Sequence, residues 1–572
     1  MSVEKTPDHL SKEQDLATFD TDLASFKEAQ VTVVTEDEET PTEEEMATLR
    51  HISDSVTWVA IVLAFAEFAE RASYYGCQGL FTNFVQRPLP KGGNGAGAVP
   101  AGSEQSAGAL GLGLTTATAV LQSFNFLSFT IPILGGLVAD VKLGRFKTIC
   151  LGVGIGVIGH ILLVIAALPT VIRSGHALAP FEISILIITL ATGLIKANVA
   201  PLVLEQARPT RIRTLKSGER VILDKTLTLQ SSMMIYYWSI YVGALLKLGT
   251  TYAEKRIGFW LGFLVPTIAF VLMIPCMAII AKPVVVQPPT GSAVFDGFKV
   301  FGVIIKKGGL KGMLKGGDAF WNHGKPSVMA VEGTLEGKKA GWLNWDDEFV
   351  DDLRKTFSAC KIFLFLPIFN LSDGGIWSLF VSMAGSMTSD GVPNDLLTAL
   401  NPITIIVFSP ILQFLLYPTL NRMGIHYPRV WRIVTGFLIC TFGQIIGAII
   451  QWRVYETSPC GWHATTCKTG VSPMSLWWVV PLYVLPSLAE LFINVECYQL
   501  AIQVAPPRMK SVVFGILLFM TALSSAIILI ISPSFKDPHL IRPFIGVACA
   551  SFVSAILIAV FFRKADIENK AR

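Results

Sequence analysis

Charged residues are scarce in this sequence. They make up only 15% of its 572 residues, whereas soluble globular proteins carry roughly a quarter. Apolar residues account for 52% of the chain, and they gather in long blocks such as 151–168, 260–280 and 430–450. A run of about 20 mostly apolar residues is enough to cross a bilayer as a helix. This composition excludes an ordinary soluble domain and indicates a polytopic membrane protein.

The blocks also lack the alternation of apolar and polar residues that marks a membrane-spanning β-barrel. Backbone groups inside a bilayer must be satisfied within the protein, so only helices and closed barrels span it. We therefore expect an all-α membrane protein with twelve spans. They are predicted near 56–86, 108–138, 144–168, 180–206, 229–251, 257–281, 357–387, 396–421, 429–452, 473–503, 510–532 and 540–562.

Signatures of catalysis are missing as well. We find no nucleophile motif, phosphate-binding loop or run of metal ligands, and the eight histidines form no cluster. The segment GVGIGVIG (152–159) follows no strand, so we interpret it as small-residue packing between helices. We expect neither an enzyme nor a nucleic-acid-binding protein, and no cofactor.

The two ends and the middle of the chain are polar. The first 54 residues are acidic, and they lack the basic start and short apolar core of a cleaved signal peptide. Six spans, a long polar stretch and six more spans form the plan of major facilitator transporters. The predicted parts are a disordered tail (1–54), a six-helix bundle (55–282), a central cytoplasmic loop (283–356), a second six-helix bundle (357–562) and a C-terminal tail (563–572).

Lysine and arginine in the short loops predict the orientation, because they favour the cytoplasmic side. Loops after even-numbered predicted spans are rich in them, as in 142–147, 208–225 and 422–432. We therefore expect a multi-pass protein of the plasma membrane with both termini in the cytoplasm. Cys460 and Cys467 then lie in a polar outer loop, where we expect a disulfide; two free thiols are the alternative.

Three ionisable residues lie inside the first predicted span. Glu67, Glu70 and Arg71 share one helix face, on which Tyr74 follows. Arg71 can neutralise only part of the negative charge, which leaves one buried carboxyl group able to titrate near neutral pH. Proton coupling requires such a group. A structural ion pair that holds helices together is the alternative.

A lysine lies deep in the fourth predicted span. Lys196 needs an acidic partner there, and Glu67 or Glu70 is the natural candidate, since spans one and four face each other in facilitator folds. The alternative is a side chain that extends to the membrane surface.

The second half contributes acidic residues to the spans. Glu490 lies in the tenth predicted span, with Asn494 one turn later, and Asp373 lies in the seventh beside two glycines. Ionisable residues inside spans are costly and therefore mark candidate functional sites. Acids in one half and Lys196 in the other suit a zwitterionic substrate. Helix-to-helix hydrogen bonds are the alternative reading of both acids.

Five motifs follow one another along the chain. They are EFAERASYYG (67–76), GGLVADVKLGRFKTI (135–149), TGLIKANVAPLVLEQ (192–206), LKSGERVILD (215–224) and PSLAELF (486–492). In this order they resemble the proton-dependent oligopeptide transporter family of the major facilitator superfamily, and above all its fungal branch. The first matches the family motif ExxERFxYYG, with Ala72 in place of Phe.

The resemblance implies roles for several of these residues. Glu67, Glu70 and Arg71 would form the proton-coupling network together with Lys196. Tyr75 would line the cavity beside Tyr74. Glu490 would hold the amino group of a peptide, and Lys196 would face its carboxylate. A proton is then the coupling ion.

The chain departs from the family pattern at the pocket. The family signature FYxxINxGSL reads YYWSIYVGAL (236–245), so that Tyr241 replaces an asparagine that contacts the peptide in the family. Phe129 replaces a cavity tyrosine, and the polar run of the seventh span becomes 373–379, which contains Trp377. A less polar pocket leaves peptide groups unpaired, at a cost of about 1–3 kcal/mol each.

These features predict a proton-coupled symporter for di- and tripeptides or peptide-like solutes, embedded in the lipid bilayer and working by alternating access. The altered pocket leads to a second hypothesis, a bulkier or modified peptide or a specialised metabolite as substrate. A third, from another class, is a nutrient receptor built on a transporter scaffold.

Overall fold

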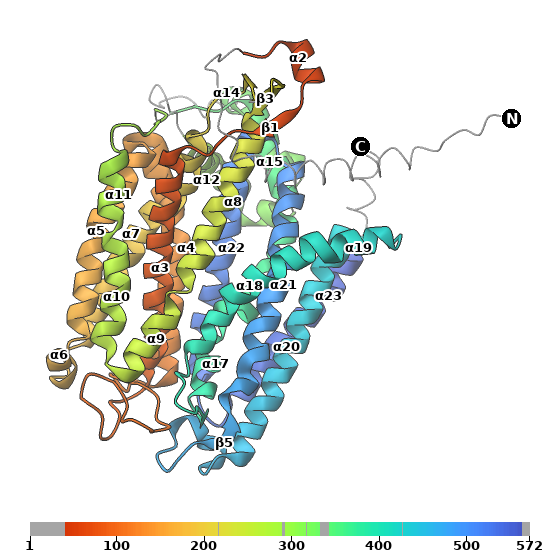
Figure 1. The fold of residues 1–572 in the computed structure, drawn as a ribbon. Helices are drawn as coiled ribbons and strands as arrows, with labels where there is room; N and C mark the ends of the chain where they lie inside the picture. The colour runs from red at the N-terminus through yellow and green to blue at the C-terminus, as the bar shows by residue number, and fades with distance from the viewer. Residues whose placement is uncertain are drawn as a thin grey trace. The chain divides into compact units, whose positions relative to one another are not determined.

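The computed structural model describes residues 40–215, 217–288, 292–315, 317–331, 342–425 and 427–562. In these residues, ten helical segments are long and apolar enough to cross a membrane (Figure 1). The long helices α3 (Trp58–Gln86) and α8 (Lys225–Ala244) are more polar. Counted with the ten, they are consistent with the twelve predicted spans. The all-α membrane fold is confirmed.

The remaining helices lie within or close to the predicted spans, except the short α6 (Pro169–Arg173), which falls between the third and the fourth. Those in the first part of the chain are α4 (Gly113–Val138), α5 (Arg145–Ala166), α6 (Pro169–Arg173), α7 (Leu178–Glu205), α9 (Lys247–Arg256), α10 (Phe259–Val271) and α11 (Met273–Ile280). Those in the second part are α16 (Leu366–Asn370), α17 (Trp377–Ala384), α18 (Leu400–Pro410), α19 (Tyr417–Arg422), α20 (Arg429–Thr457), α21 (Val480–Val504), α22 (Lys510–Ile531) and α23 (Ile541–Phe561).

Short 3₁₀ or π segments extend or interrupt several of these helices. They are η1 (Ala139–Leu143), η2 (Cys360–Phe365), η3 (Leu371–Gly375), η4 (Leu396–Ala399), η5 (Ile411–Leu416), η6 (Gly461–Thr466), η7 (Leu476–Val479), η8 (Pro507–Met509) and η9 (Ser532–Ser534). Single π turns inside helices often accompany functional sites. The π segment η3 contains Asp373, a predicted site residue.

The described chain forms two compact units. One contains the residues up to Glu67 together with Val199–Ser239 and Pro275–Gln287, and the other contains the rest. The predicted division into two six-helix bundles stays a prediction. Of the predicted tails, residues 1–39 and 563–572 lie outside the described residues.

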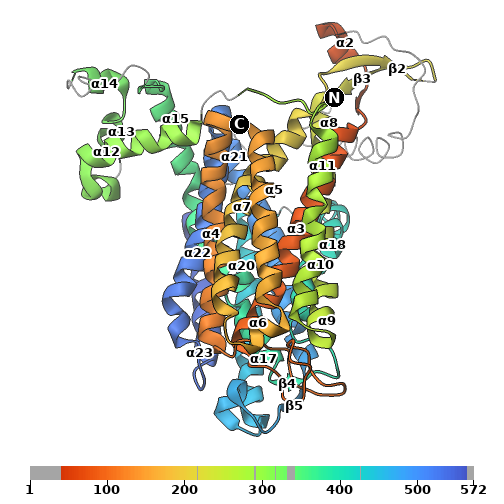
Figure 2. The ribbon, with the colours of Figure 1, turned by 90° about the vertical axis from the view of Figure 1, so that its left-hand side faces the viewer.

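The first unit contains a small sheet that sequence patterns missed. Strand β1 (His51–Ser53) pairs in parallel with β3 (Arg220–Asp224), and β2 (Arg211–Thr214) pairs antiparallel with β3. The short helix α2 (Glu43–Thr48) precedes β1, and Figure 2 shows α2 beside this sheet. The prediction of a disordered tail is therefore wrong for these residues.

Ion pairs fasten the N-terminal segment to this sheet. Nδ1 of His51 lies 2.8 Å from Oδ2 of Asp224, and Nη2 of Arg211 lies 3.0 Å from Oδ2 of the buried Asp54. A three-residue strand has little stability of its own. These side-chain pairs add stability that the short backbone pairing alone does not provide.

In the second unit, close helix packing follows from small residues. A Cβ at Gly152 of α5 would lie 2.8 Å from Cγ1 of Ile195 on α7, and one at Gly156 would overlap the ring of Phe270 on α10. Helices that present glycine can approach closely and gain van der Waals contact, which is the main packing force inside a bilayer. The interpretation of 152–159 as a packing motif is confirmed.

The central polar stretch is largely helical where the structure describes it. It contains α12 (Ala293–Lys315), α13 (Asp318–Asn322), α14 (Pro326–Val331) and α15 (Asp347–Ala359). Val350 and Leu353 of α15 join a buried cluster that includes Met509 and Val512. Nε of Arg508 also donates to Oδ2 of Asp352 at 2.6 Å. This part of the chain is therefore docked against the start of α22 by apolar and ionic contacts.

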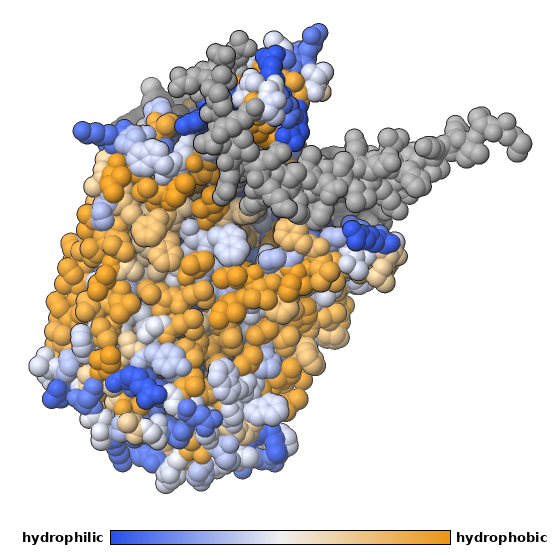
Figure 3. Space-filling view, in the orientation of Figure 1, coloured by the Kyte–Doolittle hydropathy of each residue, from blue (hydrophilic) through white to orange (hydrophobic). Residues whose placement is uncertain are grey.

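The outward side chains of the spanning helices match a lipid environment. In Figure 3, hydrophobic residues cover the flanks of the helices on the face shown, and hydrophilic residues gather towards their ends. Exposed apolar side chains include Ile158 on α5, Ile268 on α10 and Phe442 on α20. Such a surface is stable only in contact with apolar solvent.

The contact between His51 and Asp224 predicts a pH-dependent sheet. Hydrogen bonds to the Met46 carbonyl and to Asp224 raise the pKa of His51. A raised pKa stabilises the folded sheet below the ordinary histidine value, about 6.5, and this contribution disappears as pH rises through the folded-state value. Hydrogen exchange of residues 50–54, corrected for intrinsic rates, should therefore speed up with pH. The His51→Gln variant should lose this dependence; an unchanged profile would contradict the role of His51.

Candidate functional site

The seventh span loses regular helix geometry at Asp373. Its backbone angles are φ −102° and ψ 92°, and those of Gly374 are φ 97° and ψ −32°. A positive φ of this size favours glycine, since it has no Cβ to collide with the backbone. Asp373 therefore lies at a break in the helix. Nδ2 of Asn401 on α18 donates to the Oδ1 of Asp373 at 3.3 Å.

Asp373 meets the acid of the tenth span. The carboxyl group of Asp373 lies close enough to that of Glu490 for their charges to repel each other. Asn494, one turn further along α21, donates from Nδ2 to Oε1 of Glu490 at 3.5 Å. Two adjoining carboxyl groups resist carrying two negative charges. The pair is suited to hold a proton or to bind a cationic group such as an ammonium.

A buried lysine lies beside this acid pair. Lys247 of α9 is 2% exposed, and its Nζ lies 5.2 Å from the ring centroid of Tyr75 and 5.6 Å from that of Trp377. It donates to the carbonyl of Thr398 at 3.2 Å, and Asp373 attracts it electrostatically. We call Tyr75, Lys247, Asp373, Trp377 and Glu490 the central cluster.

Lys247 is the site residue that the sequence analysis missed. It lies inside the predicted span 229–251, in the segment YVGALLKLGTTY (241–252). An ionisable residue in a span is a functional candidate by default, so the signal was present. The central cluster also joins α3 and α9 with η3, α17 and α21, which belong to the two predicted halves.

The motif of the first span forms part of the predicted network. Arg71 and Glu70 form a buried ion pair, and the guanidinium carbon of Arg71 lies 5.1 Å from the ring centroid of Tyr74. Tyr74 in turn packs against Phe124 of α4 at 4.9 Å between centroids. Glu67 is buried three residues before Glu70 on α3. The role of these residues in proton coupling stays a prediction.

Lys196 rests on an aromatic ring. Its Nζ lies 3.8 Å from the ring centroid of Phe129, which places the ammonium against the electron-rich face of the ring. Phe129 stands at the position where the resemblance implies a cavity tyrosine. The substitution removes a hydroxyl but keeps a surface that holds the cation. The expected pairing of Lys196 with Glu67 or Glu70 stays a prediction.

The fifth span approaches the first very closely beside Tyr241. A Cβ at Gly243 would lie 2.7 Å from the carbonyl oxygen of Phe68 and 3.0 Å from the nitrogen of Ala72. Tyr241 itself is partly exposed on α8. The tight contact fixes α8 against the segment of α3 that carries Glu70 and Arg71.

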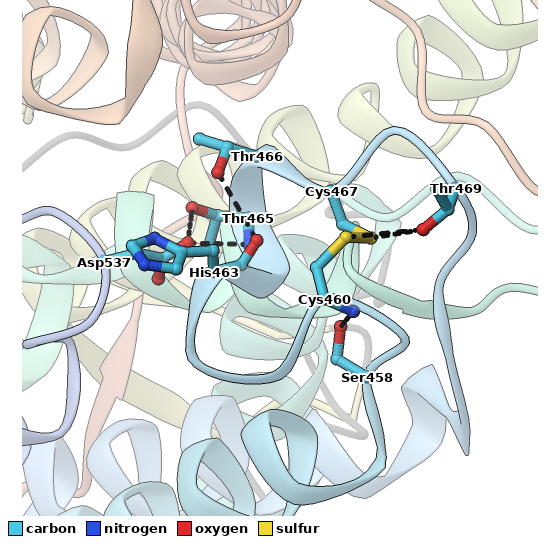
Figure 4. Close-up of a disulfide and its surroundings, with 8 residues drawn as sticks. All are labelled: Ser458, Cys460, His463, Thr465, Thr466, Cys467, Thr469 and Asp537. Carbon is cyan, nitrogen blue, oxygen red and sulfur yellow. Dashed lines mark hydrogen bonds between the residues drawn. A yellow bond between two sulfur atoms is a disulfide. The ribbon is translucent and has the colours of Figure 1, made fainter.

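The loop after α20 contains the disulfide. Cys460 and Cys467 are bonded, with their Cα atoms 5.5 Å apart. Figure 4 shows Asp537 reaching this loop, where the backbone nitrogen and Oγ1 of Thr465 donate to its carboxylate at 2.9 and 2.6 Å. The strands β4 (Met387–Thr388) and β5 (Ser472–Ser475) also pair here. We call the loops 87–112, 385–395 and 458–475 the disulfide end.

Polar contacts close the second unit at the disulfide end. Asn83 and Asn394 exchange amide hydrogen bonds of 2.9 and 3.0 Å. Glu104 accepts bonds from the backbone nitrogen and Oγ of Ser389 at 2.6 and 2.9 Å. Burial alone would raise the pKa of Glu104, but the bonds from Ser389 and the charge of Lys255 outweigh it and lower the pKa. The chain is therefore closed here between segments of both predicted halves.

Known proteins are similar to this chain over most of its length. A family model described as the POT family matches residues 146–546. The fungal transporter ucsM of Acremonium sp, named an MFS-type transporter, is 41% identical over 92% of this chain and 86% of its own. The peptide transporter PTR2 of Candida albicans is 39% identical over 93% of this chain and 86% of its own.

Solved structures show the same fold at lower sequence identity. The crystal structure of the POT family transporter PepTSo covers 89% of this chain and 99% of its own, with a TM-score of 0.64 and 19% identity. A POT family transporter in complex with 5-aminolevulinic acid covers 88% of this chain and 96% of its own, with a TM-score of 0.60 and 20% identity.

The contact at Gly243 predicts a specific loss of stability. Its two nearest neighbours are backbone atoms, which cannot rotate away, so Gly243→Ala should separate α8 from α3. We expect the free energy of unfolding to fall by roughly 1–3 kcal/mol, measured by thermal unfolding of the purified protein. Gly249→Ala is the matched control, because no atom outside its own helix turn lies within 4 Å of a Cβ there. Equal melting temperatures for the two variants would contradict the close contact.

Proposed function

The chain belongs to the POT family, and on this basis we propose that it is a proton-coupled symporter of peptides or peptide-like solutes. The observation that carries the proposal is the central cluster. It brings a buried cation, a pair of adjoining carboxyl groups and two aromatic rings together from both predicted halves. A zwitterion needs such opposite charges, and a proton-coupled cycle needs carboxyl groups that change charge.

In the proposed cycle, a proton first neutralises Glu67 or Glu70 in the first span. Neutralisation weakens the hold on Arg71 and Lys196, so that the two bundles can rock about the binding site and expose it to the other side. Proton and substrate then leave, and the ion pairs re-form. The membrane potential adds about 2.3 kcal/mol per charge for every 100 mV.

The proposed orientation follows the distribution of basic residues, with both termini and the central helices in the cytoplasm and the disulfide end outside, in the plasma membrane. A disulfide is suited to an oxidising exterior. In this orientation the described structure is closed on the outside. Relatives named peptide transporters support the peptide part of the proposal, at 39% identity in Candida albicans and 34% in Saccharomyces cerevisiae.

The proposed substrate class follows from the residues at the altered family positions. The acid pair of the central cluster would receive an ammonium group, and Lys247 with Lys196 would face a carboxylate. Trp377, Tyr241 and Phe129 favour large apolar side chains over the polar backbone of a short peptide. We therefore propose a bulky or modified peptide as the preferred solute. The name of the 41% identical relative, an MFS-type transporter, specifies no peptide.

Proton coupling can be tested in proteoliposomes with an imposed inward proton gradient. Uptake of a labelled peptide should fall by about 5–150-fold in Glu70→Gln, the range of typical coupling free energies, because the amide cannot release a proton. Glu182→Gln is the matched control, since Glu182 lies exposed on α7. A receptor on a transporter scaffold would show no gradient-driven uptake in either protein, and its response to nutrient would survive Glu70→Gln.

Substrate preference can be tested by restoring polarity to the pocket. The double variant Tyr241→Asn with Phe129→Tyr should take up simple dipeptides at least about fivefold faster than the unmodified chain, because even one restored partner recovers about 1–3 kcal/mol. Tyr237→Asn is the control, since Tyr237 is 52% exposed on the same helix. If the unmodified chain already prefers simple dipeptides, the proposed substrate class is wrong.

A further inference from the structure

A second pair of acids is buried away from the central cluster. Glu254 of α9 and Asp395, the residue before η4, are both fully buried. Their carboxyl groups lie close enough for the charge of Asp395 to act on Glu254. Asn83 of α3 donates from Nδ2 to Oε1 of Glu254 at 2.9 Å. The pair is thus built from two segments about 140 residues apart in sequence, at the disulfide end.

Most of the carboxyl oxygens of this pair receive no hydrogen bond in the described part of the chain. Oε2 of Glu254 and both carboxyl oxygens of Asp395 accept no bond from the donors in the described part of the chain. An ionised carboxylate is costly to bury without donors. Two adjoining carboxyl groups satisfy each other when one is protonated, because the acid then donates to its neighbour.

The surrounding charges do not replace that proton. Nζ of Lys255 donates to Oγ of Ser389 at 3.1 Å and to the Val392 carbonyl at 2.7 Å, and Lys247 donates to the Thr398 carbonyl. Both lysines attract the pair from a distance without an ion pair to it among the described residues. The other ionisable or charged groups around the pair are Arg87 and Glu104 of the loop 87–112, Arg256 of α9, Asp390 of the loop 385–395 and Tyr483 of α21.

The pair lies within the contacts that close the disulfide end. Asn83 bonds both Glu254 and Asn394, the neighbour of Asp395 in sequence. We propose that Glu254 and Asp395 form a proton-binding site, in which one shared proton holds the disulfide end closed and its loss opens that end. In the open state the two groups would separate into water, where each ionises near its ordinary value, about 4.

Proton binding and closure are then linked. Burial raises the pKa of Asp395, which lies one residue before the span that begins at Leu396. A site that binds its proton more tightly in the closed state favours closure at low pH, and this stabilisation is lost as pH rises through the closed-state value. The inference rests on the proposed function only for its role in transport, where a proton arriving from outside would close the outer end.

Infrared spectroscopy of the purified full chain tests the shared proton directly. At about pH 7, we expect the carboxylic-acid C=O band to lose intensity in both Glu254→Gln and Asp395→Asn, because the remaining acid then accepts from the amide and ionises. Asp390→Asn is the matched control, since Asp390 is exposed five residues earlier in the same loop. A band that stays unchanged in both variants would overturn the proposal.

Closure of the disulfide end can be measured by hydrogen exchange of residues 385–395, with the exchange rates corrected for their intrinsic values. Exchange in the unmodified chain should accelerate as pH rises, and the double variant Glu254→Gln with Asp395→Asn should lose this dependence. The amides resemble the neutral acid, so we expect all variants to fold; failure of both single variants to fold would contradict the proposed protonated state.

The two proposals fail in different ways. Loss of the infrared band in a chain that transports no solute would leave the proton site standing and remove the proposed symporter function. Gradient-driven uptake in a chain whose band and exchange are unaffected by both substitutions would retain the symporter and remove this proton site.

Discussion

Lys247 is the charge on which the arrangement of the polar interior depends. An ammonium group buried in an apolar bundle loses its hydration and must be compensated by nearby groups. Here the compensation comes from the Thr398 carbonyl, two aromatic faces and the attraction of Asp373 and Asp395. These partners lie on the opposite predicted half from Lys247, apart from Tyr75. Separation of the halves at this level would therefore remove these partners from Lys247. The position of Lys247 would thus link the proposed binding site to whether the two halves are in contact.

The helix α9 carries a residue close to each of the two acid pairs. Lys247 and Glu254 are seven residues apart on it, two helical turns or about 10 Å. The central pair, Asp373 with Glu490, lies near one end of this stretch, and Glu254 with Asp395 lies at the other. Because an acid from each pair attracts Lys247, a proton gained by one pair weakens the attraction of that pair for the cation and leaves the attraction of the other pair dominant. Such shared interactions make titrations depend on one another.

Hydropathy was sufficient to predict the helical fold, since the cost of burying polar backbone in lipid permits few alternatives. It also marked Glu70, Arg71, Asp373 and Glu490, because charges stand out in apolar runs. The partners could not be predicted, since sequence separation says nothing about which charges meet: Asp373 joins Glu490, and Lys196 lies on Phe129. Glu254 was missed because it lies past the predicted end of its span. Strand β1 was missed because three residues are too few to show a strand's alternation of apolar and polar side chains. It is stabilised instead by the ion pairs that Asp224 and Arg211 form with the N-terminal segment.

The two acid pairs differ in what they can bind, and this difference assigns them different tasks. Asp373 and Glu490 are only partly buried, beside Asn401, Asn494 and two aromatic rings, which suits the proposed binding of an ammonium group there. Glu254 and Asp395 are fully enclosed by the closing contacts, which leaves room for a proton but not for a solute. Under the two proposals, a proton would be retained at the disulfide end while the central pair would exchange its proton for a substrate ammonium. Closure of one end and occupation of the centre would then depend on each other through Lys247.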